Sequence, residues 1–305
     1  MIAAAATATL GPRTLVAVRQ FQGYVRDCVG RRAASWPHAK PLIQQIADEI
    51  HEDCGAQPLP VSLSAIVAMF RVSLRIAEPT SSRGAAKIAP IRGGFEATIF
   101  RSSDGPNDSA HPSFDLEAVI ASAPTREGNR TRFTVAHELG HTLFYARENE
   151  SSYPTRIVAQ PASFEQARWR EEGLCHDFAR ALLIPKNTRS LISNTPHMGV
   201  LVDLVRAARV TPEPLVRRIM YDWDLWPDAV LTQLTVSDGR LHAKLFRGAN
   251  RRASTGSGMT APRIEKELMG VHTLAEAEAV LVEKKLLKNQ LTMRGTQALW
   301  GVLAR

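Results

Sequence analysis

The chain has 305 residues, of which 44% are hydrophobic and 22% charged, and these proportions exclude a disordered or collagen-like protein. No apolar run approaches the roughly 18 residues that a transmembrane helix needs, so we expect no membrane association. The net charge of +8 is concentrated at the end of the chain, because residues 240–305 hold 12 Lys and Arg against 5 Asp and Glu. Such a basic segment could contact nucleic acid or an acidic partner, or form an ordinary solvated surface.

The first third of the chain alternates helical and turn signals. We expect an alanine-rich disordered tail at the N-terminus, without the basic start of a signal peptide, and then helices that end in a short apolar strand. The tail covers residues 1–10, the helices cover 12–35, 42–54 and 63–70, and the strand covers 72–76. Three widely spaced cysteines form no disulfide framework, which favours a cytoplasmic location.

The rest of the chain predicts a mixture of strands and helices. After a loop over 79–92 the sequence predicts strands over 94–100 and 114–121, then helices over 131–147, 164–183, 198–208 and 212–223. A β-hairpin is expected from 229–237 and 241–246, and alternating helix and loop from there to the C-terminus. The change in texture after Pro227 indicates a domain boundary.

One segment carries the pattern of a metal site. It reads His137-Glu138-Leu139-Gly140-His141 and lies in an apolar stretch that predicts a helix. Residues four apart share a helix face, so both imidazoles would point at one ion, for which Zn²⁺ is well suited. Glu138 could then take a proton from a metal-bound water and deliver it to a leaving amine. The alternative is an amphipathic helix with two hydrogen-bonded histidines.

A third protein ligand is expected from the next helix. Glu171 and Glu172 both stand near the start of its apolar body, and the helix phase favours Glu172 because it shares the side of Leu174 and Cys175. Glu171 falls nearer the solvent edge. Either carboxylate could instead interact with the helix dipole, and the periodicity leaves that alternative open.

The two segments together resemble a known family. RFTVAHELGH, followed by a motif that opens at Glu172 and ends in Leu182-Leu183-Ile184-Pro185, is similar to the ImmA/IrrE metallo-endopeptidases. The resemblance implies a gluzincin-like site, with His137, His141 and Glu172 on Zn²⁺ or Mn²⁺ and Glu138 as general base. It also implies a protein substrate, a helix-turn-helix transcriptional repressor that is cleaved in stress response or mobile-element control.

The resemblance sets the expected fold class and domains. We expect an α+β fold with a zincin-like metallopeptidase domain over 40–227, which includes a helix-turn-helix-like element at 199–221. Residues 1–39 would be a helical and disordered extension. Residues 228–305 would be a smaller, basic α+β domain of unknown role.

Four further residues are candidates for function. His176 stands where the family usually has Asn, so it could be a hydrogen-bonding neighbour of a ligand, an extra ligand or a substrate contact. Tyr145 follows His141 by one turn and could lie near the site or in the core. Arg217 and Arg218 would project from the second helix of the helix-turn-helix-like element and could touch DNA, although both helices could simply pack within the fold.

A different class of function remains open on this sequence. The chain could be a metal-stabilised regulator that binds DNA or protein and cleaves nothing. The basic C-terminal segment and the turn at Thr211-Pro212 favour this alternative.

Overall fold

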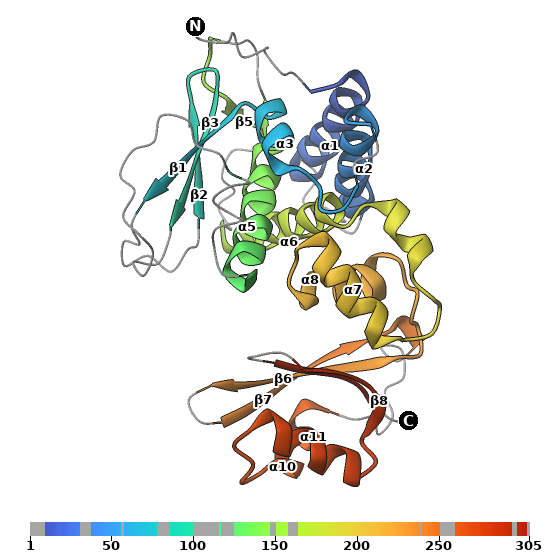
Figure 1. The fold of residues 1–305 in the computed structure, drawn as a ribbon. Helices are drawn as coiled ribbons and strands as arrows, with labels where there is room; N and C mark the ends of the chain where they lie inside the picture. Colours follow the sequence, from blue (N-terminus) through green and yellow to red (C-terminus); the bar gives the residue numbers. More distant parts are fainter. Residues whose placement is uncertain are drawn as a thin grey trace, which may run out of the picture. The chain divides into compact units, whose positions relative to one another are not determined.

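A computed structural model describes most of the chain (Figure 1). The described residues are 10–30, 38–55, 58–77, 86–100, 116, 125–146, 151–157, 164–237, 240–250, 260–294 and 298–303. Of the strand predicted over 114–121, only residue 116 lies among them, and of the tail predicted over 1–10, only residue 10 does. No helix in these ranges is long and apolar enough to cross a membrane.

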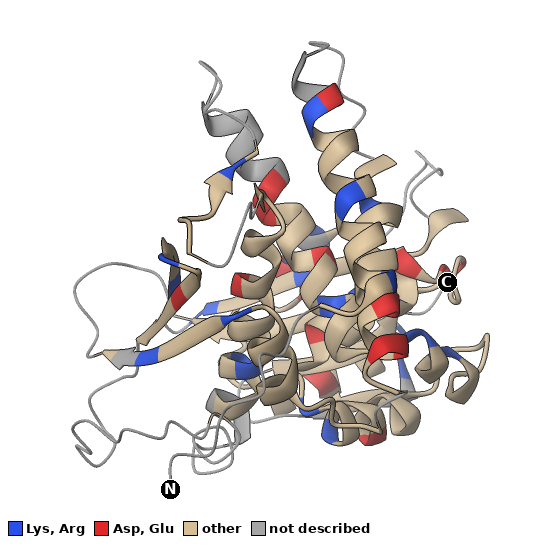
Figure 2. Ribbon diagram, turned by 90° about the horizontal axis from the view of Figure 1, so that it is seen from above, with Lys and Arg blue, Asp and Glu red and all other residues tan. Residues whose placement is uncertain are grey.

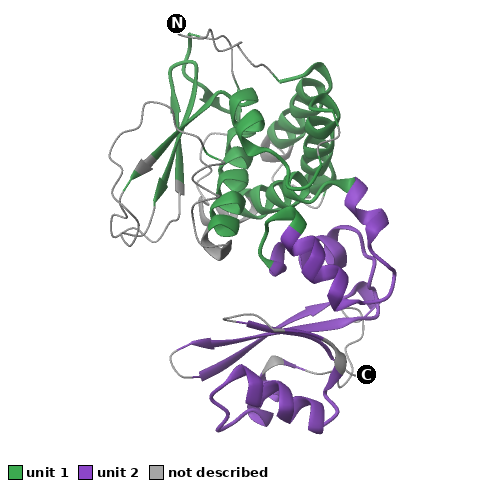
Figure 3. Ribbon diagram, viewed as in Figure 1, with its two compact units in different colours: residues 1–186, 207–211 green, residues 187–206, 212–305 purple. Residues whose placement is uncertain are grey.

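The chain divides into two compact units (Figure 3). Unit 1 holds residues 1–186 and 207–211, and unit 2 holds residues 187–206 and 212–305. The division therefore falls near residue 187, whereas the sequence places a domain boundary near 227. Unit 2 contains both the helices before residue 227 and the sheet after it, so the predicted domain limits stay a prediction.

Among its described residues, unit 1 contains five helices. They are α1 (Pro12–Gly30), α2 (Ala39–Asp53), α3 (Leu63–Met69), α5 (Thr125–Thr142) and α6 (Phe164–Leu183). Apolar residues at helical spacing bury one face of α2, where Ile43, Ile46 and Ile50 are inaccessible to solvent. The core of unit 1 forms where α6 packs against α2 and α5.

The first helix belongs to this core and is more than an extension. Phe21 of α1 packs edge-on against Phe144, with 5.4 Å between ring centroids. Gln22 donates its side-chain amide to the carbonyl oxygens of Leu143 (3.0 Å) and Tyr145 (2.9 Å). These carbonyls follow directly on α5, so α1 satisfies backbone acceptors at the point where α5 ends.

A small mixed sheet accompanies the helices of unit 1. Its order is β1 (Val72–Ala77), β3 (Gly94–Phe100) and β2 (Ala86–Ile91), with β1 parallel and β2 antiparallel to β3. The loop predicted over 79–92 was wrong for β2. Pro90 is a turn signal in the sequence, but an edge strand tolerates proline because one side of its backbone needs no partner strand.

Helix α5 begins and ends earlier than the predicted range 131–147. After Thr142 the chain turns into β4 (Tyr145–Ala146), which pairs antiparallel with β5 (Thr155–Arg156). This short hairpin returns Arg156 opposite Tyr145 in the ladder. The hairpin therefore places Thr155 and Arg156 beside the residues that follow α5.

Unit 2 begins with a helical part. It consists of the 3₁₀ turn η2 (Lys186–Leu191), α7 (Met198–Ala208), α8 (Pro212–Arg217) and the π-helical turn η3 (Arg218–Asp222). The predicted helix 198–208 is therefore confirmed, and the predicted helix 212–223 forms as α8 followed by η3. Ser193 accepts a hydrogen bond at its carbonyl from the Trp226 indole, at 2.8 Å.

The C-terminal part of unit 2 is a four-stranded antiparallel sheet with two helices. The strands β6 (Val230–Ser237), β7 (Arg240–Arg247), β8 (Leu287–Arg294) and β9 (Ala298–Leu303) lie in the order β7-β6-β9-β8. The helices α10 (Ala261–Glu267) and α11 (Leu274–Glu283) share an apolar cluster with this sheet that includes Leu234, Ile264 and Leu281.

The hairpin β6–β7 is confirmed, but the expectation of only helix and loop after it was wrong. Strand β9 lies between β6 and β8, and five of its residues are buried. A central strand covered in this way has a nearly continuous apolar sequence, which lacks the alternation that marks a half-exposed strand. The fold as a whole is α+β, as expected.

Candidate metal centre

Close packing of α5 on α6 creates the site. Gly140, between the two histidines of α5, faces Cys175 of α6, and a Cβ atom at Gly140 would lie 3.0 Å from the Cys175 Cα atom. That distance is shorter than most real contacts of a Cβ atom, so a larger residue at this position would require α5 or α6 to shift by a few tenths of an ångström. Cys175 is fully buried, and burial together with the nearby charges of Glu171 and Glu172 raises the pKa of its thiol well above the usual value.

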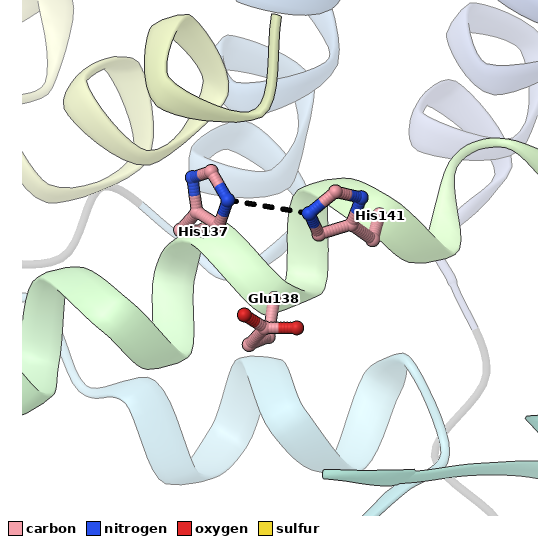
Figure 4. Close-up of side chains that lie close together, drawn as sticks. All are labelled: His137, Glu138 and His141. Carbon is pink, nitrogen blue, oxygen red and sulfur yellow. Dashed lines mark hydrogen bonds between the residues drawn. The ribbon is translucent and has the colours of Figure 1, made fainter. Parts of the chain in front are cut away.

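Two imidazoles and one carboxylate converge in this interface. The Nε2 atoms of His137 and His141 are 3.2 Å apart, and Figure 4 shows both rings on α5 with Glu138 leaving the helix between them. A Glu172 oxygen lies 3.0 Å from Nε2 of His137, and its other oxygen lies 3.7 Å from Nε2 of His141. All three side chains thus direct lone pairs toward one another.

These distances fit a shared divalent cation. Two nitrogens bound tetrahedrally to zinc at about 2.0–2.1 Å would lie about 3.3–3.4 Å apart, close to the 3.2 Å between the two Nε2 atoms. His137, Glu138 and His141 each offer a ligand atom within 4.8 Å of the others. The donor set of imidazole and carboxylate is also the set that zinc accepts.

Glu138 lies nearly buried beside this group. Burial raises the pKa of its carboxyl group, whereas the charges of His141 and His137 lower it. The carboxylate also accepts a hydrogen bond from the backbone N–H of Ile88 in β2. Glu138 is therefore a buried carboxyl group held at an edge strand next to the two imidazoles, a suitable environment for an acid–base group.

Glu171 occupies a different position from Glu172, and the expectation that Glu171 lies nearer the solvent was wrong, because the side chain of Glu172 is 34% exposed and that of Glu171 is 12% exposed. One of its oxygens lies 2.9 Å from Nδ1 of His141, the ring nitrogen opposite the converging Nε2 atoms, and its other oxygen accepts a hydrogen bond from Arg156. Burial disfavours protonation of His141, but the hydrogen bond that the ring donates to Glu171 and the charges of the surrounding carboxylates outweigh burial and raise the pKa of the ring.

The other candidates near the site are brought to different places. The His176 ring stacks on Phe133 at 5.7 Å and lies 4.4 Å from the His137 ring, measured between centroids, so it adjoins the site. The Tyr145 ring meets Phe95 edge-on at 5.4 Å and lies below the Arg156 guanidinium group. Tyr145 therefore contributes to the packing around Arg156.

Arg217 and Arg218 both have partners within unit 2. Arg217 donates to Glu213 at 2.8 Å and lies over the Phe246 ring. Arg218 is only 3% exposed and donates to Asp222. A buried, ion-paired arginine cannot reach a DNA backbone without leaving its partner, so the arrangement gives no support to a DNA contact by Arg218. The described Lys and Arg residues are interspersed with Asp and Glu along the ribbon (Figure 2).

Two contributors to the site were missed in the sequence. Arg156 was missed because no helix or strand pattern surrounds it in the sequence. It meets Glu171 only because the β4–β5 hairpin forms. The Ile88 backbone N–H lies in a range predicted as loop. Ile88 and Ile91 stand on either side of Pro90 but are three positions apart, so they do not show the two-residue alternation of a strand. No sequence signal identifies a single backbone donor.

Comparison with known families agrees with this geometry. Residues 93–220 match the family model Peptidase_M78, described as the IrrE N-terminal-like domain. The matched range includes the His137–His141 segment, both glutamates of α6, and α7 with α8. No curated protein matches the chain in sequence. Residues 93–220 are therefore similar to the IrrE-like peptidase domain, the same family that the paired motifs of this chain resemble.

Proposed function

We propose that this protein is a zinc-dependent endopeptidase with a zincin-like active site, in which His137, His141 and Glu172 hold the metal ion. The observation that carries the proposal is the convergence of both Nε2 atoms and the Glu172 carboxylate within 3.0–3.7 Å of one another. Mn²⁺ is an alternative ion, because imidazole and carboxylate ligands accept both. The match to a peptidase domain supports hydrolysis of a peptide bond as the reaction.

The chemistry assigns separate tasks to the side chains. When bound, the metal ion supplies Lewis acidity that polarises the scissile carbonyl group and lowers the pKa of water. Glu138 is the catalytic residue: its carboxylate accepts a proton from the attacking water and passes it to the amine nitrogen. The new C–O bond replaces the C–N bond, and no proton is gained or lost overall. His176, beside His137, is suitably placed to contact substrate.

We further propose that the substrate is a helix-turn-helix transcriptional repressor, cleaved in the cytoplasm during stress response or mobile-element control. This part rests on the family resemblance. A protein substrate is consistent with the peptidase domain.

The test compares wild-type protein with Glu138→Gln. Each is incubated with Zn²⁺ or Mn²⁺ and a repressor encoded by a neighbouring gene, and products are identified by mass spectrometry. Glu138→Gln should retain bound metal and lose about 10²–10⁴-fold in cleavage rate, because the general base is removed while the proposed ligands remain. Glu52→Gln, an exposed carboxylate paired with Arg13, serves as the control and should cleave normally.

Two results would contradict the proposal. Equal cleavage by Glu138→Gln and wild type would remove Glu138 from the mechanism. Sequence-specific DNA binding by the protein, unaffected by Glu138→Gln and without cleavage of any repressor, would instead support the regulator that the basic C-terminal segment suggested.

A further inference from the structure

The two histidines of the metal centre are held in different ways. Nδ1 of His141 faces the Glu171 carboxylate at 2.9 Å, and that carboxylate is in turn bound by Arg156. Nδ1 of His137 is buried, and no described residue forms a hydrogen bond with it. This asymmetry indicates that the His141 side of the site has a dedicated support.

We propose that Arg156 and Glu171 are positioning residues. Arg156 holds the Glu171 carboxylate against Nδ1 of His141, so that Glu172 and not Glu171 binds the metal ion. The inference rests on the proposed metal site. It explains why two adjacent glutamates take different roles, where helix phase favoured Glu172 as the ligand and gave Glu171 no role of this kind.

The first step concerns the proton on His141. A carboxylate oxygen only accepts hydrogen bonds, so the 2.9 Å contact requires the hydrogen to be on Nδ1. The Nε2 atom then presents its lone pair on the opposite side of the ring, where Nε2 of His137 lies 3.2 Å away. Glu171 thus selects the tautomer of His141 that can bind a cation through Nε2.

The second step concerns the hold on Glu171. Its side chain is 12% exposed and stands next to Glu172, so two carboxylates are adjacent in α6. Without a positively charged side chain paired with Glu171, either carboxylate could turn toward the metal ion. Arg156 supplies that positive charge from β5. There it is opposite Tyr145 in the ladder, and its Cζ atom lies 5.9 Å from the centroid of the Tyr145 ring.

The test measures metal binding in Glu171→Gln, Glu171→Ala and Arg156→Ala. Affinity for Zn²⁺ is obtained by chelator competition, and the ligand set is read from the absorption spectrum of the Co²⁺ form. We expect about 10–100-fold weaker Zn²⁺ binding in the Glu171 variants and a smaller loss in Arg156→Ala. The Co²⁺ spectrum of Glu171→Gln should keep the wild-type form, whereas that of Glu172→Ala should change.

Matched variants separate these effects from general damage. Glu52→Gln and Arg13→Ala alter an exposed ion pair on α1 and α2, and both should bind metal as wild type does. Arg156→Lys should recover part of the affinity lost in Arg156→Ala, because the cation is restored without the planar guanidinium group.

Several outcomes would overturn the proposal. Unchanged Zn²⁺ affinity in Glu171→Gln would show that His141 needs no such partner. A Glu171→Ala variant with the same metal loss and spectral change as Glu172→Ala would make Glu171 a ligand. Absence of metal binding by the wild-type protein contradicts the proposed function itself, and is distinguished because all variants would then behave alike.

Discussion

Each unit of this protein contains a cluster of ionisable side chains, and the two clusters are built on different principles. In unit 1, two imidazole nitrogens and the Glu172 carboxylate face a common point within 3.0–3.7 Å. In unit 2, Glu213 accepts hydrogen bonds from Arg217 at 2.8 Å and from Lys244 at 2.7 Å. The first cluster brings together hydrogen-bond acceptors, the proposed metal ligands, whereas the second pairs one carboxylate with two positively charged side chains.

The difference teaches how to separate a binding site from a structural ion pair. Burial alone would raise the pKa of Glu213, but hydrogen bonds from Lys244 and Arg217 outweigh it and lower the pKa. That cluster is complete in itself. The cluster of unit 1 is suited to an added cation, because convergent lone pairs repel one another until a positive charge is placed among them.

The largest expected effect comes from removing one of the two imidazoles whose lone pairs converge in unit 1. His141→Ala should reduce bound Zn²⁺ to background and lower cleavage by at least about 10³-fold, because the metal provides several kcal/mol of transition-state stabilisation. Elemental analysis and a cleavage assay measure the two effects. One equivalent of bound zinc in the variant would show that His141 is not needed for zinc binding and that this cluster in unit 1 is not the zinc site.

Metal removal tests the same comparison without a mutation. Zn²⁺ at about 100 times its dissociation constant should stabilise the folded protein by about 2.7 kcal/mol, since it binds the native state. Hydrogen exchange should show this protection in α5 and α6 and leave β6 and β7 unchanged. Equal protection of both units by zinc would contradict a site confined to unit 1.

Glycine substitutions test the helix packing that brings the lone pairs together. Gly140→Ala should cost about 1–3 kcal/mol of unfolding free energy, because its methyl group would meet the Cys175 backbone at 3.0 Å. That loss exceeds the gain of up to about 1 kcal/mol in helix propensity. Gly173→Ala in α6 is the control, since nothing lies within 4 Å of a Cβ atom there, and it should be neutral or stabilising.

Urea unfolding of both variants, with zinc titrations alongside, decides this prediction. Gly140→Ala should also bind zinc more weakly, and Gly173→Ala should not. Equal stability and equal affinity of the two variants would mean that α5 and α6 can separate at no cost.

The smallest effect is expected in unit 2. Glu213→Gln should cost about 0.5–1 kcal/mol near pH 7, because the carboxylate is partly exposed and its ion pairs are screened. A carboxyl group whose pKa is lowered on folding stabilises the protein above its unfolded value of about 4.5, and this contribution disappears as the pH falls through the folded value. The difference from wild type should therefore shrink as the pH is lowered below about 4.5, as measured by urea unfolding, and zinc affinity should not change.

Local patterns in the sequence were sufficient for much of the fold. Helix 164–183 and strand 94–100 formed with the predicted bounds, because each has a strong apolar period between clear breaks. The pairing of His137 with His141 also follows from helix geometry alone. Strands β2, β8 and β9 were among those missed. Pro90 in β2 resembles a turn signal, and β9, which is covered on both sides, lacks alternation.

The sequence by itself determined that two imidazoles would share one face of a helix, since that depends only on the rise and twist of a single element. Helix phase and the family resemblance favoured Glu172 as the third ligand, but only the tertiary structure decided what the neighbouring Glu171 contacts. Glu171 and Glu172 are adjacent on α6, and their roles depend on Arg156 from a hairpin and on how closely α6 approaches Gly140. Contacts between elements depend on packing, and no local period in the chain encodes them.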